Sequence, residues 1–188
     1  MIKLFELFAG YGGASFALKK AGIPFECVGY SEIDKYAIQC YEQNHWNSRE
    51  EIHYETDNNA IEEVREPIPN YGDCTKIDPL ELPDFDLLTG GHPCQSYSQA
   101  GKRLGIKDKR GQLIYNVFNI IRVKKPKYVL LENVKGLLTI DKGDTFENIM
   151  EELSSLGYNV DFRLFNSKEH GIPQNRERVF YIGVKKDD

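Results

Sequence analysis

Short apolar runs alternate along the chain with segments whose apolar residues recur at helical spacing, and this alternation most constrains the fold. The strand-like runs are residues 3–8, 27–30, 85–89, 128–131, 159–165 and 178–184. The residues expected on buried helix faces are Ala14, Ala17, Leu18 and Ala21; Ile33, Ala37, Cys40 and Tyr41; Ile114, Val117, Phe118 and Ile121; and Phe146, Ile149, Met150, Leu153 and Leu156. Such alternation predicts an α/β fold, with an open, mostly parallel sheet and helices on both faces.

Composition narrows the class of protein. The chain has 188 residues, of which 40% are hydrophobic and 28% charged, which is typical of one soluble domain over residues 1–188. No apolar run reaches the roughly 18 residues of a membrane span, and the first residues lack the apolar core of a signal peptide, so we expect a cytoplasmic protein. The four cysteines form no C-x-x-C pair, so the sequence predicts neither a metal site nor a disulfide framework.

Charge is distributed unevenly along the chain. Residues 45–71 hold seven acidic side chains and two arginines, and this local charge of −5 equals the net charge of the whole chain. We interpret this segment as an acidic insertion. Residues 99–110 hold five basic side chains and one acidic side chain, which indicates a loop that contacts phosphates. The alternative for this basic stretch is an ordinary solvated loop rich in lysine.

A glycine-rich turn, Phe8-Ala-Gly-Tyr-Gly-Gly13, lies directly after the first strand and before the first helix. Glycines let the backbone approach a ligand closely, and the start of a helix supplies free N–H groups. Glu32 follows at the end of the second strand, where a carboxylate can accept hydrogen bonds from ribose hydroxyls. Asp73 could accept a hydrogen bond from an adenine amino group. Together these residues predict a pocket for a nucleoside cofactor, although a glycine-rich turn alone is often only a tight connection.

Cys94 lies just past a predicted strand, within Gly90-Gly-His-Pro-Cys-Gln-Ser-Tyr-Ser98. A cysteine is more often a small buried hydrophobe than a nucleophile. Here it follows the carboxyl end of a strand, where the ligands of open α/β sheets bind, and the basic stretch comes after it. Because nearby positive charge favours the thiolate over the thiol, we interpret Cys94 as a nucleophile.

Two charged groups follow later in the chain. Glu132 ends the apolar strand 128–131, where a carboxylate is expensive to bury without partners, so it is either an acid of the site or a salt-bridged structural residue. Arg176 and Arg178 flank Glu177, either as part of a site or as an exposed ion-pair cluster.

In this order, the motifs resemble those of the cytosine-C5 DNA methyltransferases across essentially the whole chain. The matching residues are Phe8-Ala-Gly-Tyr-Gly-Gly13, Glu32, Asp73, Pro93-Cys94-Gln95, Gly101-Lys102, Arg110-Gly111, Glu132-Asn133-Val134 and Gln174-Asn175-Arg176-Glu177-Arg178. Each motif alone is weakly specific, but P-C-Q, E-N-V and Q-x-R-x-R in one order are highly specific. The resemblance implies a Rossmann-like methyltransferase sheet, S-adenosylmethionine as methyl donor and DNA as substrate.

The resemblance also implies roles for individual residues. Those that would line the cofactor pocket are Phe8, Gly10, Tyr11, Gly13, Glu32, Ile33, Asp73, Cys74, Pro93 and Leu113. Cys94 would be the nucleophile that adds to C6 of cytosine, and Glu132 the acid at N3. Arg176 and Arg178 would support a base flipped out of the duplex. Those that would contact DNA are Ser98, Lys102, Arg103 and Arg110.

The chain departs from the family pattern in several places. Ile33 stands where an aromatic residue is common, and His92 replaces a common phenylalanine. The acidic segment 45–71 is longer than usual and is expected to face away from DNA. After Val184 the family continues into a target-recognition region, an asparagine-containing motif and a last helix that completes the cofactor pocket.

We therefore expect one polypeptide of a split enzyme, or a truncated piece. Such a chain should fold alone, expose apolar residues beside its first and last strands, and need a second polypeptide with the target-recognition region for full activity.

Three other functions are compatible with part of the sequence. The same chemistry could act on RNA, as in the tRNA-modifying branch of the family. The chain could bind a cofactor or assemble with a partner without catalysis, but the intact Cys94, Glu132 and arginine pair count against this. A nicotinamide dehydrogenase would explain the glycine turn and Glu32, but it leaves P-C-Q unexplained.

Overall fold

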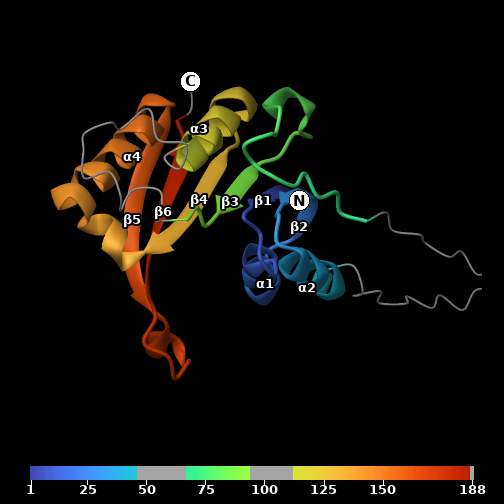
Figure 1. Cartoon of the computed structure of the whole chain (residues 1–188), viewed down its shortest axis with the longest axis horizontal. Coiled ribbons are helices and arrows are strands. Elements are labelled where there is room, and N and C mark those ends of the chain that lie inside the picture. Colours follow the sequence, from blue (N-terminus) through green and yellow to red (C-terminus); the bar gives the residue numbers. More distant parts are fainter. Residues whose placement is uncertain (46–66, 94–111, 187–188) are drawn as a thin grey trace, which may run out of the picture.

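The computed structural model describes residues 1–45, 67–93 and 112–186 (Figure 1). Its helices are α1 (Gly13–Lys20), α2 (Lys35–His45), α3 (Gln112–Lys124) and α4 (Asp144–Ser155), with short 3-10 helices η1 (Pro79–Glu81), η3 (Lys135–Leu138), η4 (Ile140–Gly143) and η5 (Ser167–His170). Its strands are β1 (Ile2–Leu7), β2 (Phe25–Ser31), β3 (Leu87–Gly90), β4 (Tyr128–Val134), β5 (Tyr158–Asn166) and β6 (Glu177–Lys185).

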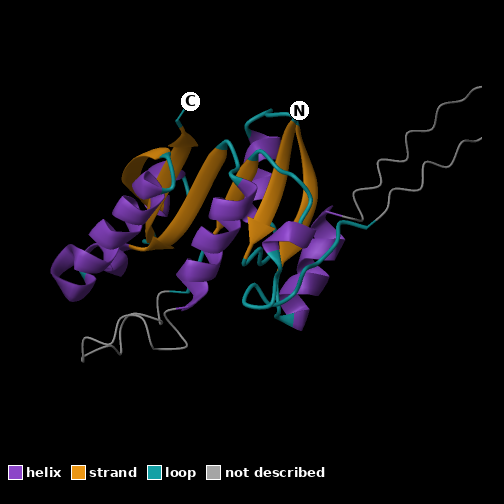
Figure 2. Ribbon diagram, turned by 90° about the horizontal axis from the view of Figure 1, so that it is seen from above, coloured by secondary structure: helices purple, strands orange, loops and turns teal. Residues whose placement is uncertain are grey.

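These strands form one sheet (Figure 2), and their order in it is β2-β1-β3-β4-β6-β5 (Figure 1). The four strands β2, β1, β3 and β4 are parallel, whereas β6 runs antiparallel to β4, and β5 antiparallel to β6. The predicted α/β class is confirmed. Because β6 runs opposite to β4, the amino-terminal end of β6 lies where β1, β3 and β4 have their carboxyl ends.

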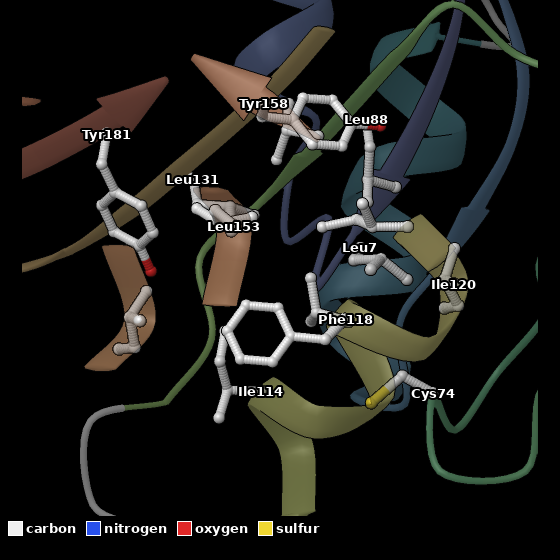
Figure 3. Packing of buried hydrophobic residues seen from close by; sticks show 14 of the residues in the cluster. Leu7, Cys74, Leu88, Ile114, Phe118, Ile120, Leu131, Leu153, Tyr158 and Tyr181 are labelled. Atoms are coloured by element: carbon white, nitrogen blue, oxygen red, sulfur yellow. The ribbon is translucent and has the colours of Figure 1, made fainter. Parts of the chain in front are cut away.

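Helices cover both faces of the sheet, as predicted. Leu7 of β1 belongs to the main core, in which it packs with Phe118 of α3 (Figure 3). Glu6, its neighbour in β1, points to the opposite face because side chains alternate along a strand. There the buried Glu6 carboxylate accepts hydrogen bonds from the hydroxyls of Ser15 in α1 and Tyr41 in α2, both at 2.7 Å.

The predicted inner faces of α3 and α4 are confirmed. In α3, Ile114, Val117, Phe118 and Ile121 are all buried. In α4, Phe146, Ile149 and Leu153 are buried, and Met150 and Leu156 pack against the same core. Gly157 follows α4 with φ 93°, a left-handed conformation that ends the helix at the predicted place.

The predicted inner face of α1 is partly wrong. Ser15 is the buried residue of this helix, whereas Ala17 and Ala21 are exposed. The reason is the Glu6 carboxylate beneath the helix, which accepts hydrogen bonds from both the backbone N–H (3.2 Å) and the hydroxyl of Ser15. A buried carboxylate needs polar partners, so a polar residue turns inward where an apolar one was expected.

The α2 prediction is also partly wrong. Tyr41 is buried as expected, but Cys40 is exposed and Ile33 is 72% exposed. Ile33 precedes the helix, which begins after Asp34. The Asp34 carboxylate accepts hydrogen bonds from the backbone N–H groups of the first turn, including that of Ala37 (2.9 Å), as an N-cap does.

Strand β4 extends farther than predicted. Its ladder with β6 continues until Val134 lies opposite Arg178, so Glu132 and Asn133 lie within the strand and not after it. The antiparallel partner supplies hydrogen bonds beyond the apolar run 128–131, and for this reason the strand does not end where its hydrophobic residues end.

Both ends of the segment 45–71 belong to the fold. His45 is the last residue of α2, and Asn70 forms a bridge with Tyr30 of β2. The Tyr30 N–H donates to the Pro69 carbonyl (3.0 Å) and the Tyr71 N–H donates to the Tyr30 carbonyl (2.7 Å). Residues 69–71 therefore lie along the β2 edge of the sheet, while β5 forms the opposite edge. The interior of the predicted acidic insertion, residues 46–66, lies outside the described residues.

Candidate active site

The chain changes direction across the sheet at β1. Strand β2 lies on one side of β1, and the chain then crosses to β3 on the other side. In open α/β sheets, ligands bind beyond the carboxyl ends of the strands at such a switch point. The glycine turn follows β1, Glu32 follows β2, and residues 91–93 follow β3. The predicted cofactor residues come from three separate segments of the chain. These segments therefore meet at the carboxyl-terminal ends of the strands.

The glycine turn is left-handed at Phe8 (φ 52°), Gly10 (φ 57°) and Gly12 (φ 84°). A Cβ atom at Gly12 would lie 2.0 Å from Nε2 of His45, so only glycine fits against that ring. At Gly10 no atom of residues 1–45, 67–93 or 112–186 lies within 4 Å of the position that a Cβ would take, which leaves open space beside the backbone. The turn thus packs against α2 at one glycine and exposes its backbone at the other.

Glu32 connects the turns that follow β1 and β2. One carboxylate oxygen accepts a hydrogen bond from the Gly10 N–H (2.9 Å), and the other accepts from Ile33 (2.8 Å) and Asp34 (3.0 Å). Hydrogen bonds to a charged acceptor are the stronger kind, so the carboxylate is held in one orientation. Its remaining lone pair, on the oxygen that accepts from Gly10, suits a donor such as a ribose hydroxyl.

Asn70 supports Glu32 and escaped the sequence prediction. Its side-chain oxygen accepts hydrogen bonds from the N–H groups of Glu32 (3.2 Å) and Gly72 (2.9 Å), and its amide donates to the Glu32 carbonyl (3.2 Å). The available signal was an asparagine two residues before a glycine, a pattern typical of turns. It was missed because Asn70 falls within the segment interpreted as an insertion.

Asp73 and Cys74 face different surroundings. The Asp73 carboxylate accepts hydrogen bonds from the backbone N–H (3.0 Å) and the hydroxyl (2.8 Å) of Thr75, which lower the pKa of Asp73. Burial raises the pKa of the Cys74 thiol to about 11, and its sulfur lies in the main core (Figure 3). A cofactor contact at Cys74 would therefore come from its backbone.

Four more predicted cofactor residues lie around the carboxyl-terminal ends of these strands. Tyr11 is 59% exposed and Ile33 is 72% exposed, and they follow Gly10 and Glu32 directly in the sequence. Pro93 is exposed after β3, whereas Leu113, in the first turn of α3, packs partly buried against the main core. The exposed apolar side chains provide a surface on which a flat ring could lie.

Glu132 and Arg178 form an ion pair, with 2.6 Å between Oε1 and Nε. Both side chains are largely but not fully buried, with 30% and 22% of their surface exposed. Glu132 Oε2 faces β3, where it would lie 3.0 Å from a Cβ at Gly91. Glycine at this position therefore gives the carboxylate room beside the segment that leads to Pro93.

Arg176 does not lie beside Glu132. It is exposed in the connection that precedes β6, where its backbone carbonyl accepts a hydrogen bond from Ser167 (3.0 Å). This connection projects away from the sheet (Figure 1). Glu177 pairs with Lys135 across 2.9 Å, and not with the side chains of the arginines that flank it. The structure thus brings Arg178, but not Arg176, to Glu132.

Two buried polar residues lie behind Glu132, and the predicted site did not include them. The Asn133 amide donates to the His92 backbone carbonyl (2.8 Å), and His92 is only 3% exposed. An Asn next to the predicted acid and a His next to Pro93 were the available signals.

Several predicted site residues lie outside the described residues: Cys94, Ser98, Lys102, Arg103 and Arg110. In residues 1–45, 67–93 and 112–186, no cluster of three or more His, Cys, Asp or Glu side chains suits a metal ion. Within the same ranges, no helix combines the length and the apolar character that crossing a membrane requires.

Comparisons with known proteins identify relatives of this chain. The chain is 44% identical over 186 residues to the orphan methyltransferase M.Rho11sI of Bacillus phage rho11s, covering 99% of this chain and 33% of that protein. It is 40% identical to the type II methyltransferase M.NlaX of Neisseria lactamica, covering 100% of this chain and 54% of that protein. The chain therefore spans about a third to a half of the length of these curated relatives.

Solved structures and a family model complete the comparison. The S. pombe Dnmt2 methyltransferase superposes with a TM-score of 0.76 at 24% identity, covering 100% of this chain and 52% of that chain. This likeness confirms the expected Rossmann-like methyltransferase fold. The model of the family described as C-5 cytosine-specific DNA methylase matches residues 2–188. The chain therefore belongs to the C-5 cytosine-specific DNA methylase family.

Proposed function

We propose that this chain is the cofactor-binding and catalytic part of a cytoplasmic enzyme that transfers a methyl group from S-adenosylmethionine to C5 of cytosine in DNA. The observation that carries this proposal is the Glu132–Arg178 pair beside Gly91. It provides a fixed carboxylate next to the segment that leads to Cys94. This carboxylate lies at the carboxyl-terminal ends of the strands, where the predicted cofactor residues also lie. An acid and a nucleophile side by side are what addition to a cytosine ring requires.

The residues at the switch point fit S-adenosylmethionine. Gly10 leaves open space beside the turn, and the Glu32 carboxylate next to it can accept a hydrogen bond from a ribose hydroxyl. Asp73 can accept one from the adenine amino group, and Tyr11, Gly13, Ile33, Pro93 and Leu113 would complete the pocket with the Phe8 and Cys74 backbones. When bound, S-adenosylmethionine supplies an electrophilic methyl group on a sulfonium sulfur.

Cys94 makes cytosine reactive. C5 of cytosine is a poor nucleophile, so the Cys94 thiolate first adds to C6 and forms an S–C6 bond. Glu132 takes up a proton from solvent when the base binds and delivers it to N3, so that C5 becomes the nucleophilic carbon of an enamine. Arg178 holds Oε1 of Glu132 and leaves Oε2 for the base. After C5 has taken up the methyl group, a base from solvent removes the C5 proton. The S–C6 bond then breaks with Cys94 leaving as the thiolate, and the N3 proton returns to Glu132, which restores the ring and the enzyme.

The base must leave the duplex for this chemistry, since a stacked cytosine cannot be reached by Cys94 and Glu132. We propose that Arg178 and Arg176 support the flipped base and its strand, and that Ser98, Lys102, Arg103 and Arg110 contact DNA. Phosphate contacts of this kind hold the strand in register without reading its sequence.

Covalent trapping tests the proposed function. Duplex DNA with 5-fluorocytosine should form a stable adduct with the chain and S-adenosylmethionine, because fluorine at C5 cannot leave as a proton does. DNA at about 100 µM compensates for binding without base readout, which typically has a Kd of about 10⁻⁴–10⁻⁶ M. Cys94→Ser should form no adduct, since a hydroxyl is far less acidic than a thiol. No adduct with the unmodified chain would refute the proposal, and methylation of tRNA instead of duplex DNA would redirect it to RNA.

We propose further that a second polypeptide supplies the target-recognition region. The chain spans 33% and 54% of the two relatives named above, and the last strand exposes Ile182 and Val184, as expected for a receiving surface. Adding that polypeptide should tighten the binding of both DNA and labelled S-adenosylmethionine in a titration. Robust sequence-specific methylation by the 188-residue chain alone would refute this part of the proposal.

A further inference from the structure

Asn70 lies between the two carboxylates that would bind the nucleoside of the cofactor, and the proposed chemistry gives it no task. Glu32 directly follows β2, and Asp73 follows the residues that form a bridge with β2. Both carboxylates would bind one nucleoside, so the affinity for that nucleoside depends on their relative position. The hydrogen bonds of Asn70 extend toward both of them.

The backbone around Asn70 pairs with β2 before the side chain does. The Tyr30 N–H donates to the Pro69 carbonyl (3.0 Å), and the Tyr71 N–H donates to the Tyr30 carbonyl (2.7 Å). Tyr30 is thereby paired as in a parallel ladder. Glu32 lies two residues farther along the chain, and there the side chain of Asn70 provides the pairing.

The Asn70 carboxamide binds Glu32 as a peptide unit would. Its oxygen accepts a hydrogen bond from the Glu32 N–H (3.2 Å), and its nitrogen donates to the Glu32 carbonyl (3.2 Å). A carboxamide carries the same donor and acceptor as the backbone, so one side chain pairs both polar backbone groups of Glu32. The Glu32 carboxylate is held separately, by the Gly10 N–H on one oxygen and by the N–H groups of the next two residues on the other.

The same Asn70 oxygen holds the backbone that leads to Asp73. It accepts a hydrogen bond from the N–H of Gly72 (2.9 Å), two residues farther on, as an asparagine in a turn does. The Gly72 carbonyl accepts a hydrogen bond from the hydroxyl of Ser31 (2.6 Å), which is buried. Because the peptide unit is planar, holding this carbonyl also sets the direction of the peptide bond that enters Asp73.

We propose that Asn70 is a positioning residue that fixes the carboxylates of Glu32 and Asp73 relative to each other, and thereby determines the preference of the pocket for an adenine ribonucleoside. Ser31 assists at the second carboxylate. This inference rests on the proposed function, since it deepens the assignment of the two carboxylates to S-adenosylmethionine. One nucleoside can bond to both acceptors at full strength only when their separation is kept, because hydrogen bonds weaken steeply with poor distance or angle.

The alternative is that Asn70 only closes a turn at the surface. Its loss would then weaken the binding of every nucleoside to the same extent, or destabilise the fold without changing the preference among nucleosides. A positioning role predicts a selective loss. Nucleosides without the ribose hydroxyls or without the adenine amino group should lose less affinity than adenosine does, because they do not use the acceptor that has moved.

The test measures the Kd of adenosine, 2′,3′-dideoxyadenosine and inosine by displacement of labelled S-adenosylmethionine from the chain. The first analogue lacks the ribose hydroxyls, and the second has an oxygen in place of the adenine amino group. Each analogue should bind the unmodified chain at least about 10-fold more weakly than adenosine, because a hydrogen bond to a charged acceptor is lost. Asn70→Ala should weaken adenosine binding about 10-fold and reduce each of these two preferences about threefold.

Two further variants serve as comparisons. Ser31→Ala removes the hydroxyl from the Gly72 carbonyl but leaves the contacts of Asn70 in place, so it should reduce only the preference for adenosine over inosine. Asn166→Ala is the matched control, because Asn166 also accepts a hydrogen bond from an N–H two residues farther on, that of Lys168 (3.3 Å). Asn166 ends β5, at the opposite edge of the sheet from β2, so this variant should leave all three Kd values unchanged.

The outcomes are separable. If the unmodified chain binds neither S-adenosylmethionine nor adenosine, the proposed function fails and this inference fails with it. If the chain binds adenosine but Asn70→Ala weakens all three nucleosides equally, or no more than Asn166→Ala does, the positioning role is refuted while the proposed function stands. A reduction of only one preference by Asn70→Ala would refute the link between the two carboxylates.

An isosteric variant keeps the test decisive if Asn70→Ala does not fold. Asn70→Asp retains the oxygen that binds the two N–H groups and replaces only the donor to the Glu32 carbonyl. It should therefore reduce the preference for adenosine over 2′,3′-dideoxyadenosine. An unchanged preference in this variant would refute the positioning role.

Discussion

Replacing Gly12 by alanine should destabilise the fold, because the added methyl group would collide with the imidazole ring of His45. The added Cβ would lie 2.0 Å from His45 Nε2, so the ring must move and lose its hydrogen bond to the Tyr11 carbonyl (3.0 Å). That loss costs about 0.5–1.5 kcal/mol, and φ 84° costs a residue with a Cβ about 1–2 kcal/mol. Alanine restricts the unfolded chain, which returns about 0.4–1 kcal/mol. The net loss of unfolding free energy is therefore roughly 1–3 kcal/mol.

Gly10→Ala is the matched control for this change. Gly10 has φ 57° in the same turn, but in the part of the chain that the structure describes nothing lies within 4 Å of its Cβ position. It should therefore lose only the conformational part, roughly 0–1.6 kcal/mol. Urea unfolding followed by circular dichroism measures both variants, with an unchanged m-value as the sign that the unfolded state is comparable. In a His45→Ala background, the difference between the two glycine variants should disappear.

Two results would refute this reasoning. Equal destabilisation by Gly12→Ala and Gly10→Ala would show that the His45 ring does not determine the cost. A difference that persists in the His45→Ala background would place the steric conflict elsewhere.

Three other changes have definite expected outcomes. Glu132→Gln keeps the shape of the side chain but cannot deliver a proton, so the rate of single-turnover methylation should fall about 10²–10⁴-fold while the affinity for DNA stays unchanged. A normal rate together with lost DNA binding would indicate that Glu132 has a structural role. Tyr41→Phe removes a donor from the buried Glu6 carboxylate and should cost about 1.5–3 kcal/mol in urea unfolding, whereas an unchanged midpoint would contradict this. The pKa of His92 is about 4 in the folded chain and 6.5 ordinarily, so below pH 6.5 the unfolded chain binds the extra proton. The free energy of unfolding should therefore fall by about 3 kcal/mol between pH 6.5 and pH 4. In urea unfolding, His92→Phe should remove that part of the pH dependence. If the two proteins show the same change of unfolding free energy with pH, the prediction is contradicted.

The sequence was sufficient for the class of fold, and it singled out three segments that the structure places together after β1, β2 and β3. Apolar periodicity located α3 and α4 because the inner faces of these helices pack into the apolar main core. It failed on α1 because Glu6, an acid inside an apolar strand, makes Ser15 the inward residue. One strand residue thus determined the orientation of a helix that follows it in the chain.

The contact between Glu132 and Arg178 could not be derived from sequence. Both residues were identified separately, but their meeting depends on β6 running antiparallel to β4. The alternation of side chains along a strand is the same in both directions of the chain. The pattern therefore does not show whether a strand runs parallel or antiparallel to its neighbour. The contact between His92 Nε2 and the Tyr181 hydroxyl (2.6 Å) was hidden for the same reason, because the two residues are 89 positions apart and meet only through this pairing.

The two borders of the sheet differ in how much backbone they leave available. Along β2, the residues around Asn70 bind both the N–H and the carbonyl of Tyr30, so part of this border is already occupied. On the other side, the nine-residue β5 pairs with β6 and exposes Phe162 and Leu164. Unpaired backbone flanked by apolar side chains is a template for strand addition between molecules. Self-association of this chain at high concentration would therefore start at β5, and a lysine at Phe162 would suppress it.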